Sequence, residues 1–198
     1  INLAGVHHDE VDRGAELASP GHLAASRLLT ARLSMLSTAG RPLKDRARVR
    51  VHIGTAGTMA SVRLLDAEAA KAGENALAQL FRSEPVAATW RQPLVLRSES
   101  PVATIGGGVV LDPAAERIRH ADDNVLKLLG ELESNDEAAR AAAALFFAGL
   151  RGWQAADLAR TAGIADTGGI AERLKASGNL QSLSLPRGRT LVAHNVAL

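Results

Sequence analysis

Hydrophobic and polar side chains follow two different periods along this chain, and the change falls near residue 112. Before it the two kinds of side chain alternate, as in residues 26–36, where Leu29, Ala31, Leu33 and Met35 share one face. A period of two is typical of a strand with one buried side. The other predicted strands are residues 47–53, 58–66, 76–82, 85–89, 94–97 and 102–111. Short strands separated by glycine and proline, with no helical pattern between them, predict a β-sandwich or β-barrel.

After residue 112 the hydrophobic period becomes helical. The predicted helices are residues 122–133, 136–149, 154–161 and a last one that ends at Ser177. Asn135 is expected to cap the second helix, and Asp166 or Thr167 the last one, with Gly178 just past its end. Strands at 180–185 and 190–196 flank a turn. Helices followed by a hairpin predict a winged-helix domain.

Composition excludes some chemistry. The chain has 198 residues, a net charge of +2 and no cysteine, which excludes disulfides, thiolate metal sites and cysteine nucleophiles. No apolar run is long enough to cross a bilayer, and we expect a cytoplasmic protein with no membrane partner. The cluster His7-His8-Asp9-Glu10 is expected to be a solvated hairpin tip, because neighbouring residues on a strand face opposite ways. We therefore predict no metal site and no catalytic residues.

Positive charge is concentrated in the first half of the chain. Residues 41–50 hold five basic side chains against Asp45 alone, a local excess of +4. Residues 113–198 carry ten basic and ten acidic side chains and are neutral overall. If the protein binds a nucleic acid, the first half is the better candidate.

Three of these cations and one histidine lie at alternate positions. The side chains that face away from the apolar side of residues 47–53 are Arg46, Arg48, Arg50 and His52. Alternate residues on a strand lie about 6.6–6.8 Å apart, close to the phosphate spacing of a nucleic-acid strand, and arginine forms forked hydrogen bonds to phosphate. The alternative is a solvated barrel face on which Asp66 or Glu84 pairs with the arginines.

Three motifs are more specific than the periodicity. Arg13-Gly14 precedes Pro20-Gly21, Ser100-Pro101 precedes Thr104-Ile105-Gly106-Gly107-Gly108, and Gly152-Trp153 precedes residues 157–163. With the string of residues 49–56, these motifs resemble the SelB family of selenocysteine-specific translation elongation factors. Residue 57 departs from that pattern, since the family usually has an acidic residue where this chain has Gly57.

The resemblance implies a fold class and four segments. It implies an elongation-factor β-barrel followed by a winged helix, in a chain that is a fragment of a longer protein. The implied segments are residues 1–22 (last strands of domain II), 23–113 (domain III barrel), 114–121 (linker) and 122–198 (winged helix).

The resemblance also implies partners. The intact family delivers selenocysteinyl-tRNA to the ribosome at recoded UGA codons in a GTP-dependent reaction. GTP and Mg belong to the family's GTPase domain, so we expect neither a cofactor nor enzyme activity in this segment. The mRNA hairpin is expected to bind winged helices outside it.

The same resemblance favours RNA binding by the basic row, because the corresponding part of domain III approaches the T stem of tRNA. The implied tRNA-binding candidates are Arg46, Arg48, Arg50, His52, Thr55, Arg97, Ser98, Ser100 and Thr104. Turn formation is the alternative role of the serines. On the winged helix the nucleic-acid candidates are Arg173, Lys175, Arg187 and Arg189, although the neutral charge of this half favours a protein-packing spacer.

Two other classes of protein fit parts of the pattern. A different tRNA-carrying translational GTPase would share the barrel but would have a helical hairpin in place of the wing. A winged-helix DNA-binding regulator with an accessory barrel would carry a strongly basic recognition helix. The run Gly106-Gly107-Gly108 lacks the Gly-Lys-Ser/Thr of a phosphate loop and is expected to allow close strand packing or a bulge.

Overall fold

The structure, a computed structural model, describes residues 4–149, 155–185 and 189–195. Its first part is a closed antiparallel barrel with the strand order β1-β6-β4-β3-β7-β8, which confirms the barrel prediction. The barrel strands are β1 (Ala25–Met35), β3 (Arg48–Ile53), β4 (Ala56–Leu64), β6 (Asn75–Ala87), β7 (Pro93–Ser98) and β8 (Ala103–Asp112). A small sheet pairs β2 (Leu43–Lys44) with β5 (Ala69–Ala70).

The barrel core is built from the apolar faces that the alternation predicts. Leu29, Ala31 and Leu33 of β1 are completely buried, and so is Val51 of β3. Alternate side chains point to opposite sides of a strand, so burying these residues turns their polar neighbours outward. The exposed face of β3 follows directly from this arrangement.

Strand β6 corrects one prediction. Residues 76–82 and 85–89 are not separate strands, because β6 runs through Ala87 without a break. Its register with β1 shifts between Ser26 and Leu28, and no β1 partner faces Pro85. Proline lacks an N–H and is tolerated where the ladder is interrupted.

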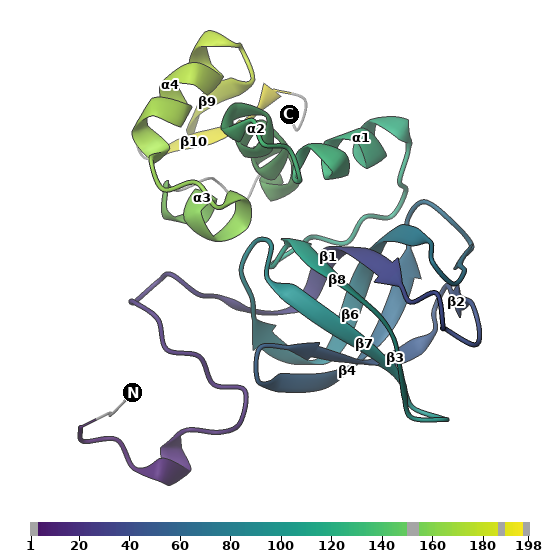
Figure 1. Cartoon of the computed structure of the whole chain (residues 1–198). Coiled ribbons are helices and arrows are strands. Elements are labelled where there is room, and N and C mark those ends of the chain that lie inside the picture. Colours follow the sequence, from purple (N-terminus) through teal and green to yellow (C-terminus); the bar gives the residue numbers. More distant parts are fainter. Residues whose placement is uncertain (1–3, 150–154, 186–188, 196–198) are drawn as a thin grey trace.

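The segment before the barrel also differs from its prediction. Within residues 4–24 the structure has no strand, only the short 3-10 helix η1 (His8–Glu10), whereas the sequence predicts strand structure and a hairpin tip there. A strand requires a partner for its backbone groups, and no described strand pairs with this segment. In Figure 1 it forms an open loop beside the barrel, which it contacts at Glu16, whose Oε1 accepts from Gln92 Nε2 at 3.4 Å.

Helices and a hairpin make up the second part, as predicted. They are α1 (Asp123–Glu131), α2 (Glu137–Ala148), α3 (Ala155–Ala162), α4 (Thr167–Ala176), β9 (Leu180–Leu185) and β10 (Arg189–His194). Asp136, not Asn135, caps α2, because the Asp136 carboxylate accepts from Ala138 N at 3.0 Å. Asp166 caps α4. No helix within the described ranges is long and apolar enough to cross a membrane.

The helices lie on one side of the barrel, next to β1 and β8, as Figure 1 shows. Leu77 and Leu111 of the barrel share one apolar cluster with Leu129 and Leu132 from the first helix and its C-cap. Trp90, which follows β6, connects the barrel with the helices directly, because its Nε1 donates to Leu132 O at 2.8 Å. The two parts are therefore packed together and not joined by the connecting segment alone.

Candidate nucleic-acid interface

Strand β3 presents a shorter basic row than the sequence predicts. Arg48 and Arg50 are exposed and His52 is half-buried, all on the outer face. Arg46 lies outside β3, in a turn with φ 61°, because the backbone forms an irregular loop before the strand. Arg97 joins the row from the neighbouring strand, since its Cα pairs with Arg50.

These cations have no carboxylate partners among the residues that the structure describes. Within residues 4–149, 155–185 and 189–195, no ion pair within 4.0 Å involves Arg48, Arg50 or Arg97. Asp66, one of the partners considered from the sequence, instead accepts from Leu77 N with both oxygens at 3.0 Å. Arg97 Nε and His52 Nε2 are buried without a hydrogen-bond partner. The face is therefore a set of cations that the described part of the protein does not neutralise.

The β7–β8 hairpin gives Ser98 a structural role. Its hydroxyl donates to Pro101 O at 2.5 Å and accepts from Ala103 N at 3.2 Å, so it holds the turn closed. The Ser100-Pro101 bond in this turn is cis. Ser100 and Thr104 are exposed on the hairpin, and Thr55 is exposed in the β3–β4 turn. The hydroxyls of these three residues lie at the surface.

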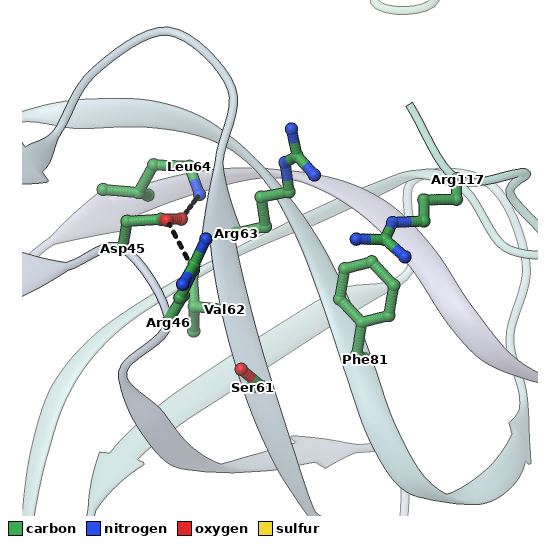
Figure 2. Close-up of a pocket in the computed structure, with 8 residues that line it drawn as sticks. All are labelled: Asp45, Arg46, Ser61, Val62, Arg63, Leu64, Phe81 and Arg117. Carbon is green, nitrogen blue, oxygen red and sulfur yellow. Dashed lines mark hydrogen bonds and ion pairs between the residues drawn. The ribbon is translucent and has the colours of Figure 1, made fainter. Parts of the chain in front are cut away.

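Three further residues extend this surface and were not found from the sequence. Arg63 of β4, Phe81 of β6 and Arg117 from the segment after β8 line a hollow of about 420 Å³ together with Arg46 and others (Figure 2). The alternation of β4 would have placed Arg63 outward, beside Ser61. No local signal could have found Arg117, because only the tertiary fold brings it to β6.

Comparison with known proteins bears on this barrel directly. Residues 30–117 match the family described as "Selenocysteine-specific elongation factor, beta-barrel domain". The chain is 32% identical over 132 residues to a selenocysteine-specific elongation factor from Desulfomicrobium baculatum, a match that covers 66% of this chain and 21% of that protein. The barrel of this chain belongs to the SelB family.

A solved structure agrees in fold with most of this chain. The crystal structure titled as bacterial selenocysteine-specific elongation factor EF-Sec superposes with a TM-score of 0.61 at 19% identity. The superposition covers 98% of this chain and 28% of that one. This chain thus spans only 21% of the length of the first relative and 28% of the length of the second.

Gly57, at the position where the SelB pattern has an acidic residue, pairs with His52 in the β3–β4 register. A Cβ at position 57 would stand 3.1 Å from two atoms of the His52 ring, closer than ordinary contact. The half-buried His52 ring therefore occupies space that is free because residue 57 has no side chain. An acidic residue at position 57 would require the His52 ring to move.

The winged-helix candidates are placed differently from the barrel candidates. Arg173 Nη2 lies 3.4 Å from Asp136 Oδ1, and Lys175 Nζ lies 2.9 Å from Glu172 Oε1. Arg187 lies outside the described residues, and only the backbone of Arg189 is described, in β10. Among the described residues, no group of three or more histidine, cysteine or acidic side chains could hold a metal ion.

Proposed function

We propose that this segment binds tRNA on the outer face of its barrel, as the domain III part of a factor that delivers selenocysteinyl-tRNA to the ribosome. The observation that supports it is the row Arg48, Arg50 and Arg97, which has no carboxylate partner among the described residues. Unneutralised arginines on an exposed strand attract a polyanion and form forked bonds with its phosphates. The SelB resemblance implies the T-stem side of the tRNA as the contact.

A second part of the proposal concerns the winged helix. In the SelB family, winged helices hold the mRNA hairpin, and we propose that this one positions such modules while binding no RNA itself. The pairing of Arg173 and Lys175 with neighbouring carboxylates supports the spacer role. Trp90 and the shared apolar cluster would fix its direction relative to the tRNA-binding barrel.

Replacing Arg48 and Arg50 together by Gln is expected to weaken binding of selenocysteinyl-tRNA at least about tenfold at moderate salt, since each arginine contributes a charge-assisted contact. The slope of log affinity against log salt should fall by about 2, one unit for each lost phosphate contact. Filter binding across a salt series measures both quantities. An elongator tRNA in parallel reports how much of the binding is specific.

The matched control removes two positive charges from the winged helix instead. Arg173→Gln with Lys175→Gln gives the same net charge and should change the affinity less than about twofold, because both cations are already paired. Equal losses in the two double variants would mean that only net charge matters. That result would contradict a tRNA site on the barrel.

A further inference from the structure

We infer that the hollow lined by Arg46, Arg63 and Arg117 is a binding site for an RNA backbone phosphate, with the Phe81 ring as one wall. This inference rests on the proposed function and extends its surface across two more strands. The hollow measures about 420 Å³, a size within the range of small-ligand sites. In Figure 2 the Arg46 guanidinium lies at the left, that of Arg63 at the upper centre, and that of Arg117 at the right above Phe81.

The charge of the hollow favours an anion. Its lining includes three arginines and a single carboxylate, Asp45. That carboxylate is already engaged, because Asp45 Oδ1 accepts from Leu64 N at 3.0 Å and Oδ2 lies 3.6 Å from Arg46 Nε. Within the described part of the chain, Arg63 and Arg117 have no acidic partner. Two guanidinium groups therefore remain to be neutralised by a ligand.

Arg117 is held in place through its neighbours. The completely buried Gln79 donates to Glu116 O at 2.8 Å and accepts from Ile118 N at 3.0 Å. The backbone on both sides of Arg117 is thus tied to the barrel, while its guanidinium lies 5.9 Å from the centre of the Phe81 ring. Arg63 Nη2 also donates to Arg119 O at 2.7 Å. An ordered cation loses less freedom when it binds a phosphate than a mobile one does.

The backbone of Arg46 adopts a conformation that is unfavourable for an L-residue. Its φ of 61° lies in the left-handed region, which costs an L-residue about 1–2 kcal/mol and which glycine adopts freely. Hydrogen bonds to β4 impose the conformation, since Arg46 N donates to Val62 O at 2.7 Å and Val62 N to Ala47 O at 2.9 Å. An exposed arginine in a strained position is consistent with a functional role.

The hollow is continuous with the basic row. Ser61, which lines it, pairs with Arg48 on one side and with Phe81 on the other. A polyanion lying across β3 would therefore reach β4 and β6 with its next phosphates. An extended RNA backbone has enough phosphates to contact the positive side chains of all three strands. A single acidic side chain would contact only those that line the hollow.

The first test uses inorganic phosphate as the probe on the whole 198-residue chain. Phosphate titrated into the labelled protein should shift the amide resonances of Ser61 and Phe81 and the side-chain Nε–H resonance of Arg117. The double variant Arg63→Gln with Arg117→Gln, which no longer has the Arg117 resonance, should lose the shifts of Ser61 and Phe81. Unchanged spectra in the starting protein, or equal shifts in the double variant, would overturn the site. Phosphate bound in the hollow without an effect of the variant on RNA binding would mean that the site takes free phosphate only, and would also overturn the inference.

The second test separates binding from stability. Arg46→Gly should bind a T-arm RNA hairpin about two- to threefold more weakly, because the Arg46–Asp45 pair is long at 3.6 Å and leaves the guanidinium exposed to a ligand. Its Tm should stay unchanged or rise by about 1–3 °C, because glycine relieves the left-handed strain. Arg91, whose φ is 59°, provides the matched control outside the hollow. Arg91→Gly makes the same change of residue and should leave RNA affinity unchanged. Equal RNA affinity of Arg46→Gly and the starting protein would overturn the role of Arg46.

The failures of the two proposals are distinguishable. If Arg48→Gln with Arg50→Gln weakens RNA binding and the hollow variants do not, the hollow is not a phosphate site while the barrel proposal stands. If only the hollow variants weaken binding, the site stands and the basic row does not. Poly-glutamate that competes as well as the RNA hairpin at equal charge would show that the hollow does not distinguish phosphate from carboxylate, which also overturns the inference.

Discussion

Gly108→Ala is expected to destabilise the barrel by about 3 kcal/mol or more, because there is no room for a methyl group at this position. A Cβ there would lie 2.1 Å from Arg32 O and 3.1 Å from Leu33 Cα, both backbone atoms of β1. Neither can move without opening the β1–β8 ladder that closes the barrel. Thermal unfolding should show a fall in Tm of about 6–12 °C.

Gly130→Ala is the matched control for this prediction. Gly130 lies inside α1, and a Cβ there would meet no atom within 4 Å. Alanine is a better helix former than glycine by about 0.5–1 kcal/mol, so the same substitution should stabilise the protein slightly. If Gly108→Ala melted within a degree of the Gly130→Ala protein, the close approach of β8 to β1 would be wrong.

Trp90→Ala is expected to separate the winged helix from the barrel. Trp90 donates to Leu132 O, its backbone N–H donates to Arg160 O at 2.9 Å, and the Arg140 guanidinium carbon lies 4.8 Å from its ring centre. Removing the ring deletes the side-chain contacts at once, and we expect a loss of about 3 kcal/mol. Calorimetry should then show two unfolding transitions where the parent protein has one.

Two companion variants test the geometry of this interface. Trp90→Phe keeps an aromatic ring but loses the Nε1 hydrogen bond, so it should cost only about 1 kcal/mol and keep a single transition. Gly163→Ala changes the residue that packs against the Trp90 ring. Its Cβ would lie 2.3 Å from Trp90 Cε3, and the φ of position 163 is 64°. This variant should therefore show two unfolding transitions, as Trp90→Ala does. Unchanged cooperativity in both Trp90→Ala and Gly163→Ala would contradict a rigid junction.

The fold was predictable from the sequence where one periodicity extends over several residues. Val49, Val51 and Ile53 are buried as the alternation of β3 predicts. Close packing was the correct interpretation of the glycine run, since a Cβ at Gly106, Gly107 or Gly108 would lie 2.7, 2.9 or 2.1 Å from a backbone atom of a neighbouring strand. The register shifts of β8 fall beside the run, at Ile105 and Leu111. Strands β2 and β5 have two residues each, too few to show any period.

The site was only partly predictable, for a physical reason. Alternation along β3 identifies Arg48 and Arg50, but it wrongly extends to Arg46, because a loop with a left-handed residue has no signature in an arginine. Arg117 lies 36 positions after Phe81 in the sequence and reaches it only because Gln79 holds the segment after β8 against the barrel. Such convergence depends on tertiary hydrogen bonds, which no local pattern records.

Site-specific photo-cross-linking tests the central claim, tRNA binding by the outer face of the barrel, most directly. A benzophenone side chain at Val95, an exposed position paired with His52, would sit on the proposed surface without removing a cation. The same group at Glu172 would probe the exposed side of α4. We predict cross-links to acceptor-side and T-stem nucleotides of selenocysteinyl-tRNA from position 95 and none from position 172. Cross-links from position 172 alone would place the RNA on the winged helix and contradict the account.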